Sequence, residues 1–180
     1  MNNAPWSLDG SLVSLDDYPL LKKYFSRHSQ LRKRHIAQKS SSVWYRTIDK
    51  VRAEVVNQPK LLLQDMRSKI NPVLEPGGYY PHHNLYYLVS DKWDLEVLGG
   101  LLLSRIAQAF VEAYSVRMRG GTLRFQAQYL KQIRVPDPDA IGVKLSNSLK
   151  RAFRARDIEA ATSAAASAYG IDLVEYELEV

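Results

Sequence analysis

A mixed α+β fold is predicted by three patterns in this 180-residue sequence. Apolar residues recur at steps of three and four over residues 94–116, a spacing typical of one long amphipathic helix. Residues 59–65 and 85–89 are compact apolar or aromatic runs bounded by turn-forming residues, which is typical of strands. Both ends of the chain carry further helical patterns. We therefore expect a small β-sheet packed by a long apolar helix, with additional N- and C-terminal helices.

The N-terminal part begins with an irregular lead-in over residues 1–17, which are rich in Asn, Pro, Ser and Gly. Residues 18–38 then follow a helical pattern, with aspartates available to cap its start. On the basic face of its second half, Arg32 and Arg34 could follow a phosphate backbone, although such faces are more often solvated. Trp44, which follows three serines, is expected to anchor the core.

The chain is long enough to bury one sizeable core, and nothing in its composition demands two. We expect a single domain over residues 18–180, with its core in 43–136 and a helical section in 137–180. Within that section, residues 140–156 should form a helix with a basic outer face. Residues 158–169 are Ala-rich and should form a helix that stops at the following glycine.

The net charge of +6 is unevenly distributed along the chain. Residues 22–60 contain eleven Lys or Arg against two acids, whereas residues 157–180 contain six acids and no Lys or Arg. This segregation suggests a polyanionic partner for the basic parts, with the acidic tail either solvated or docked on protein.

Membrane insertion and secretion are disfavoured by the sequence. Charged residues and glycines interrupt the long apolar window over residues 95–113, and the chain has neither cysteine nor a cleavable leader pattern. We therefore expect a soluble protein without a membrane partner, located in the cytoplasm.

The segment after the long apolar helix is the first candidate site. Every formal charge from Ser115 to Val135 is positive, and Gly120-Gly121 allows a sharp turn. Interleaved amides at Gln126 and Gln128 add donors and acceptors. The cations are Arg117, Arg119, Arg124, Lys131 and Arg134. This set suits contact with phosphates and base edges, although a Gly-Gly pair is often a plain helix cap and exposed arginines are often only solvated.

The alternation over residues 123–130 predicts how this segment would present its polar groups. If it is extended, the apolar positions Leu123, Phe125 and Ala127 face the core, while Arg124 and the two glutamines share the opposite face. If it is helical, the polar residues splay. We predict extended chain near Arg124 that passes into a helix around Gln128. In the alternative, structural role, Arg124 pairs with a nearby carboxylate such as Glu112.

A second candidate cluster is the polar and aromatic run before the strand at residues 85–89. It comprises Tyr79, Tyr80, His82, His83 and Asn84. No third His or Cys lies at ligand spacing, so a zinc site is disfavoured. The histidines are expected to bond phosphate or a base, or to cap a turn.

Catalytic motifs are missing from the sequence. It contains no Gly-x-Ser-x-Gly elbow, no Walker loop, no cysteine nucleophile and no tight carboxylate pair beside a lysine of the metal-nuclease type. Asn71-Pro72 could begin an Asn-Pro-Pro-Tyr motif, which holds the amine that receives a methyl group. Val73 and Leu74 stand where the second proline and the aromatic residue would be, so we reject this match. No catalytic residue and no metal ligand is therefore expected in this chain.

Several short motifs together resemble a known family. They are a Leu-rich helix, then Arg119-Gly-Gly-x-Leu-Arg-Phe125, then Tyr129-Leu-x-x-Ile-x-Val-Pro136, with Tyr18-Pro-Leu-Leu21, Trp44-Tyr45, Pro59-Lys-Leu61 and Gly78-Tyr-Tyr80 upstream. This pattern resembles the C-terminal target-recognition domain of restriction-modification N6-adenine DNA methyltransferases of the TaqI type. The resemblance runs from about residue 18 to about residue 170 and covers the specificity domain only.

The resemblance implies that this chain works together with a separate catalytic domain. Such a domain clamps double-stranded DNA against a methyltransferase domain, in cis or in trans, which flips out the adenine and methylates it. S-adenosylmethionine would be the cofactor of the parent enzyme and would not bind to this chain, which would choose the site without performing the transfer.

Two other functions stay open at the level of sequence. One is a nucleic-acid-binding module without sequence preference, in which Tyr79, Tyr80 and Phe125 would be stacking platforms. The other is a structural or assembly domain of a DNA-modification complex, whose basic surface binds its own acidic tail or a partner protein. A salt titration of DNA binding would distinguish these functions.

Overall fold

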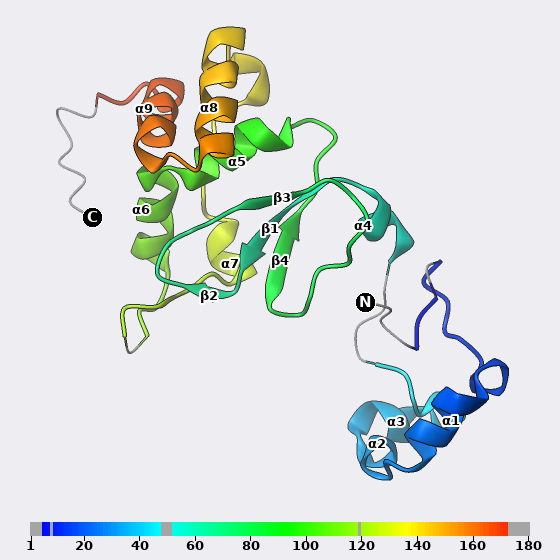
Figure 1. The fold of residues 1–180 in the computed structure, drawn as a ribbon. Helices are drawn as coiled ribbons and strands as arrows, with labels where there is room; N and C mark the ends of the chain where they lie inside the picture. The colour runs from blue at the N-terminus through cyan, green and yellow to red at the C-terminus, as the bar shows by residue number, and fades with distance from the viewer. Residues whose placement is uncertain (1–4, 8, 48–51, 119, 173–180) are drawn as a thin grey trace. The chain divides into compact units, whose positions relative to one another are not determined.

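The computed structural model describes residues 5–7, 9–47, 52–118 and 120–172 of the chain. It divides into two compact units, Met1–Asn57 and Gln58–Val180 (Figure 1). The boundary between compact units therefore falls after residue 57, whereas the sequence led us to expect one domain from residue 18 onward. Since compactness does not test independent folding, the single domain stays a prediction.

The first unit consists of short helices around a small core. Its elements are η1 (Leu15–Asp17), α1 (Pro19–Ser26), α2 (Gln30–Lys33), α3 (His35–Lys39), η2 (Ser41–Val43) and α4 (Ala53–Asn57). The prediction of one helix over residues 18–38 was wrong, because Arg34 takes an extended conformation and Ser29 does not continue α1. Trp44 is 8% exposed among Leu15, Ala37 and Tyr45, which confirms it as a core anchor.

The second unit is built on a three-stranded antiparallel sheet. Its spatial order is β3 (Val73–Glu75), β1 (Lys60–Gln64) and β4 (Leu85–Leu88), so β1 is central. Both strands predicted from the sequence are confirmed in β1 and β4. Leu61 and Leu63 alternate onto one face and are almost fully buried against the helices.

The long apolar helix is two helices, α5 (Leu95–Leu103) and α6 (Arg105–Tyr114), bent by 66°. The single helix predicted over residues 94–116 was therefore wrong at Ser104, whose backbone is extended. The Ser104 hydroxyl accepts a hydrogen bond from the N–H of Ala107 at 3.3 Å and donates one to the carbonyl of Leu101 at 2.6 Å. These bonds cap α6 and close the end of α5 in a buried position where water cannot do so.

All but one residue of the predicted apolar stripe are buried or half-buried. Leu98, Leu102 and Ile106 are buried, while Leu95, Ala109 and Phe110 are half-buried. The prediction was wrong for Ala113, which is exposed, because the bend changes which side of α6 meets the core.

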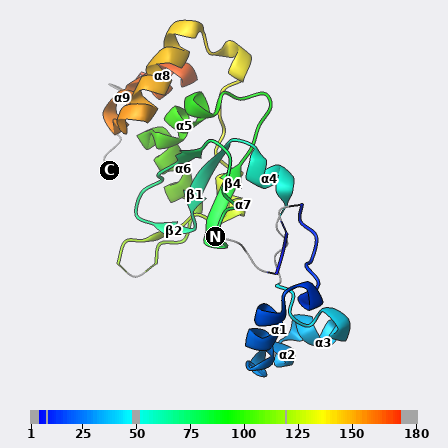
Figure 2. The same cartoon turned by 45° about the vertical axis from the view of Figure 1, so that its right-hand side comes forward.

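Helix α5 is buried on both sides. One side packs on the sheet, and the other packs on α8 (Val143–Ala155) and α9 (Ile158–Tyr169), as Figures 1 and 2 show. The close crossing with α8 depends on two glycines. A Cβ at Gly99 would lie 2.6 Å from the Phe153 ring, and one at Gly100 would lie 2.6 Å from the carbonyl oxygen of Leu149. A larger residue at Gly100 would force the two helices apart, and one at Gly99 would displace the Phe153 ring.

The C-terminal helices follow the sequence closely. Helix α9 has the predicted bounds, and Gly170 ends it in the left-handed conformation at φ 67°. Helix α8 begins three residues later than predicted, after the 3-10 turn η3 (Pro138–Ala140). Together these elements confirm a mixed α+β fold with a small sheet and helices at both ends.

Membrane-spanning potential is confined to one pair of helices. Within the described ranges no single helix is long and apolar enough to cross a bilayer, and α5 with α6 meets the criteria only as a bent pair.

Candidate nucleic-acid interface

A short antiparallel ribbon carries the predicted basic segment. Strands β2 (Met66–Arg67) and β5 (Leu123–Arg124) pair with Met66 opposite Arg124 and Arg67 opposite Leu123. On its other side Leu123 pairs with Arg117, and the N–H of Met118 donates to the carbonyl of Thr122 at 2.9 Å. We call residues 66–67, 116–118 and 122–124 the basic ribbon. In Figures 1 and 2 the segments that follow α6, residues 116–118 and 122–124, lie beside β2 and below α6.

The turn of the ribbon uses its two glycines. Gly120 and Gly121 adopt φ values of 87° and 74°, which L side chains rarely adopt. The Gly-Gly pair therefore forms the turn that the sequence predicted. Arg119, another predicted DNA-binding residue, lies outside the described residues.

Arg124 is held by its backbone while its side chain is exposed. The Ser115 hydroxyl donates to the carbonyl of Arg124 at 2.9 Å and accepts from its N–H at 3.2 Å. In the part of the chain that the structure describes, the Arg124 guanidinium has no carboxylate partner. The alternative pairing with Glu112 is wrong, because that carboxylate binds Arg117 at 3.2 Å and the amide of Gln108 at 2.7 Å.

The predicted change from extended chain to helix is confirmed. Leu123 and Phe125 are each 2% exposed, and α7 (Ala127–Leu130) begins directly after Gln126. Ala127 was expected to face the core but is exposed, because the helix starts there and ends the two-residue alternation. The amide of Gln128 donates to the Gln126 side chain at 3.1 Å, so these two amides lie together just after Arg124.

The His82–Asn84 turn meets the same end of the sheet. The carbonyl of Asn84 accepts from the N–H of Asp65 at 3.0 Å, and the carbonyl of Asp65 accepts from the N–H of Phe125 at 2.7 Å. The rings of His82 and His83 lie 3.9 Å apart, and all three side chains of the turn are exposed. The structure therefore brings His82, His83 and Asn84 close to the Arg124 end of the ribbon.

Tyr79 and Tyr80 lie toward the other end of the sheet. Glu75, which is opposite Lys60 in the register, accepts hydrogen bonds from the backbone N–H groups of Gly77 and Tyr79. Strand β4 instead begins opposite Gln64. Tyr79 is 71% exposed and could stack on a base, but Phe125 is buried and was wrongly considered as a stacking platform.

Lys131 and Arg134 follow α7 and are exposed. The carbonyl of Arg134 accepts a hydrogen bond from the Tyr169 hydroxyl at 2.6 Å, which ties this end of the basic segment to α9. Burial raises the pKa of Tyr169 to about 12. The backbone of Arg134 is thus fixed while its side chain stays in solvent.

Arg32 and Arg34, in the first unit, have intramolecular roles. The Arg32 guanidinium lies 3.9 Å from the centroid of the Trp44 ring, a cation–π contact. Arg34 donates to the carbonyls of Leu31, Trp44 and Arg46 at 3.1 Å each. Nε and one terminal nitrogen of Arg34 are therefore engaged in the fold, and DNA contact by either side chain stays a prediction.

Arg67 is a ribbon residue that the sequence analysis missed. It is exposed beside Leu123, and its charge, after the larger effect of burial, helps to lower the pKa of Arg156. No sequence pattern identifies it, because β2 is only two residues long. Only the pairing with β5 brings Arg67 close to Arg117.

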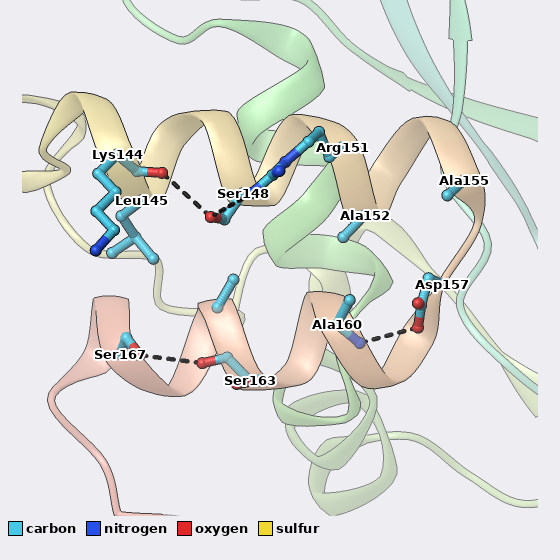
Figure 3. A pocket seen from close by; sticks show the side chains of 11 residues that line it. Lys144, Leu145, Ser148, Arg151, Ala152, Ala155, Asp157, Ala160, Ser163 and Ser167 are labelled. Atoms are coloured by element: carbon cyan, nitrogen blue, oxygen red, sulfur yellow. Dashed lines mark hydrogen bonds between the residues drawn. The ribbon is translucent and has the colours of Figure 1, made fainter.

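A groove of about 700 Å³ lies between α8 and α9 (Figure 3). Alanines and serines line most of it, and Asp157 in its wall is engaged as the N-cap of α9. Gly99 and Gly100 are occupied by helix packing and form no phosphate-binding loop. Among the residues with described positions, no group of three or more His, Asp or Glu is placed to hold a metal ion.

Comparison with known proteins identifies the family of this chain. The model of the TaqI-like C-terminal specificity domain matches residues 12–135, and the chain belongs to this family. The type II methyltransferase M.BstVI of Geobacillus stearothermophilus is 47% identical over 138 residues, covering 76% of this chain and 25% of the relative. M.XhoI of Xanthomonas vasicola is 42% identical over 175 residues, covering 97% of this chain and 32% of the relative. M.PaeR7I of Pseudomonas aeruginosa is 43% identical over 168 residues, covering 93% and 29%.

The chain thus spans between a quarter and a third of the length of these curated relatives. The family assignment confirms the resemblance seen in the sequence motifs.

Proposed function

We propose that this chain is the DNA sequence-recognition domain of a restriction-modification N6-adenine DNA methyltransferase. It binds duplex DNA through the basic ribbon and positions the target site for a catalytic domain supplied in cis or in trans. The observation that carries this proposal is Arg124, a cation with a fixed backbone and a free guanidinium, in a chain of the TaqI-like specificity family.

The part of the ribbon that suits the major groove of B-DNA is its two-stranded hairpin, residues 116–118 and 122–124. That groove is about 12 Å wide and admits a two-stranded β-ribbon. Arg124 projects from β5, with the amides of Gln126 and Gln128 next along the chain. A guanidinium pairs with the O6 and N7 atoms of guanine, and a glutamine amide pairs with the N6 and N7 atoms of adenine. Arg124 and the glutamines would therefore read bases.

Other cations would set the position of the domain on the DNA backbone. Arg117 at the ribbon, and Lys131 and Arg134 after α7, carry exposed side chains suited to phosphates. His82, His83 and Asn84 form a neighbouring turn with exposed donors and acceptors. In this proposal the phosphate contacts supply most of the binding affinity, and Arg124 supplies the sequence specificity.

The catalytic steps belong to the rest of the enzyme. S-adenosylmethionine would be held by the catalytic domain, because the described glycines and the α8–α9 groove offer no matching site here. The methyl donor supplies the group that is transferred to the adenine. A protein that acts on genomic DNA in this way would work in the cytoplasm.

The test uses the full-length methyltransferase that contains this domain. Arg124→Ala should lower the discrimination between the correct and a wrong base by about 1–3 kcal/mol at one position of the site. Lys131→Ala should instead weaken binding to all DNA sequences alike. Methylation rates on a panel of duplexes, each with one altered base pair in the site, measure both effects. An unchanged preference profile with Arg124→Ala would remove Arg124 from recognition, and absence of sequence-dependent DNA binding by the wild type would reject the function.

A further inference from the structure

The outer face of the basic ribbon is apolar as well as cationic. Opposed residues in an antiparallel pair share one face, and neighbours along a strand alternate. Leu123 faces the core, so its partner Arg117 lies on the Leu123 side. Val116 and Met118, on either side of Arg117, therefore share the outer face with Arg124. Met66, paired with Arg124, completes this face.

The three apolar residues of this face are well exposed. Val116 is 64%, Met66 54% and Met118 44% exposed. None of them belongs to a hydrophobic core cluster of the described structure. Three neighbouring apolar side chains held in water by a paired ribbon form a patch, which commonly marks a contact surface.

The charges around the patch define the chemistry of its partner. Arg124 shares the outer face with the patch, whereas Arg67 and Arg117 pair with Leu123 and lie on its side of the ribbon; all three are exposed and positive. The neighbouring carboxylate of Glu112 is engaged by Arg117 and Gln108. A matching partner is anionic at its edges and presents small apolar groups between them. The DNA major groove has this arrangement, with phosphates on both sides and thymine C5-methyl groups on its floor.

We propose that Met66, Val116 and Met118 contact thymine C5-methyl groups in the major groove, next to the base read by Arg124. This inference rests on the proposed function, and it adds a class of base contact that the polar residues cannot make. The thioether chains of Met66 and Met118 are unbranched, so they adapt to the position of a methyl group. Gly120 and Gly121, in the turn, carry no side chain that would keep the ribbon out of the groove.

The predicted base contact can be removed from the DNA without changing the protein. Deoxyuridine lacks only the methyl group of thymidine, and a site that contains a target adenine contains at least one thymine opposite it. In the full-length methyltransferase, replacing each thymine of the site singly by deoxyuridine should weaken binding about fourfold at one or two positions. This corresponds to about 0.8 kcal/mol for one buried methyl group.

Protein variants identify which side chain makes each contact. Met66→Ala, Val116→Ala and Met118→Ala should each lower affinity for the thymine duplex, and one of them should abolish the difference between thymine and deoxyuridine at a given position. Val143→Ala is the matched control, because Val143 is 79% exposed on α8, away from the ribbon. It should leave the difference unchanged.

The outcomes separate this inference from the function on which it rests. If the wild type prefers its site but binds thymine and deoxyuridine duplexes equally at every position, the methyl contact is wrong and the function stands. If the wild type shows no preference among sequences, both are wrong. If the alanine variants keep the thymine preference but lose association with the catalytic domain, the face is a protein contact and the proposal is overturned.

Discussion

The Ser115 hydroxyl occupies both backbone polar groups of Arg124, donating to its carbonyl and accepting from its N–H. Ser115 is also the residue at which α6 ends, and its own N–H donates to the carbonyl of Val111 at 2.7 Å. One residue thus connects the end of a packed helix to the backbone of the main candidate base-reading side chain. The backbone of Arg124 is therefore already ordered, so a binding partner would have to order only its side chain.

Removing that hydroxyl should loosen Arg124 while leaving its charge in place. Ser115→Ala deletes two hydrogen bonds, so we expect a loss of about 1–2 kcal/mol in unfolding free energy and weaker discrimination at the base read by Arg124. Methylation rates on cognate and single-base-variant duplexes measure the discrimination. Ser115→Thr keeps the hydroxyl and is the control; equal loss in both variants would show that the hydroxyl is not the cause.

Helix packing at Gly100 should be intolerant of a single methyl group. Gly100→Ala places a Cβ 2.6 Å from the Leu149 carbonyl oxygen, and backbone cannot swing away as a side chain can. We expect destabilisation of about 1–3 kcal/mol from overpacking. Gly142→Ala is matched to it, because no atom lies within 4 Å of the added methyl group. Thermal unfolding of both variants tests this, and similar melting temperatures would contradict the close crossing.

The buried ion pair of Lys60 and Glu75 should make stability sensitive to acid. Burial alone would raise the pKa of Glu75, but the hydrogen bonds from Lys60 and Gly77 and the charge of Lys60 hold it below its ordinary value. Ionised Glu75 therefore stabilises the fold above its unfolded-state pKa, and this stabilisation is lost as the pH falls through the folded-state pKa. Lys60→Met should cost about 3–5 kcal/mol, because it leaves a buried carboxylate without its cation.

Urea unfolding at neutral and acidic pH measures this contribution. Glu75→Gln should flatten the acid side of the stability profile relative to the wild type. A profile that keeps its full acid slope in Glu75→Gln would assign the slope to other carboxylates, such as Asp94 and Glu96, whose pKa values are also lowered by hydrogen bonds from α8 cations.

Tyr169 should link stability to alkaline pH. Its folded-state pKa of about 12 lies above the ordinary value of 10.0, so neutral Tyr169 stabilises the fold below pH 10. That contribution is lost as the pH rises through 12. Tyr169→Phe removes the hydrogen bond to the Arg134 carbonyl and should cost about 0.5–1.5 kcal/mol at neutral pH. When tyrosine ionisation is followed by absorbance, the transition at the highest pH should be missing from the variant. If that transition remains, it belongs to another tyrosine.

The isolated chain should be catalytically silent and bind DNA weakly. Without the catalytic domain, this domain makes only part of the contacts with DNA. We therefore expect salt-sensitive dissociation constants for DNA of about 10⁻⁶ to 10⁻⁴ M. We also expect neither binding of S-adenosylmethionine nor methyl transfer. A salt series of DNA-binding measurements and a methylation assay on a homogeneous preparation test these statements. Tight binding that is indifferent to salt, or any methyl transfer, would contradict them.

Local patterns predicted those elements whose residues carry their own signals. Helix α9 has alanines, a capping aspartate and a terminal glycine, and its bounds match the prediction. The change near Gln126 from alternation to helix was also visible in the sequence. The bend at Ser104 was not, because apolar residues continue on both sides and one buried serine sets the break.

Which residues form the ribbon could not be predicted from the sequence, because they are brought together by pairing between strands that are far apart in the chain. Met66 meets Arg124 and Arg67 meets Leu123 through strands more than fifty residues apart, each only two residues long. Such short strands carry no periodicity of their own. The sequence therefore indicated the cations of residues 117–134 but neither the second strand nor the apolar outer face.

The ribbon is attached to the body of the unit by few buried side chains, chiefly Leu123 within it and Phe125 directly after it. Everything else along residues 116–118 and at Met66 and Arg67 is exposed. Substitutions at these surface positions therefore leave the packed interior almost untouched, and most would change stability little. New site preferences could arise during evolution, or be engineered by exchanging these few residues between relatives, without the folding cost that usually accompanies a change of function.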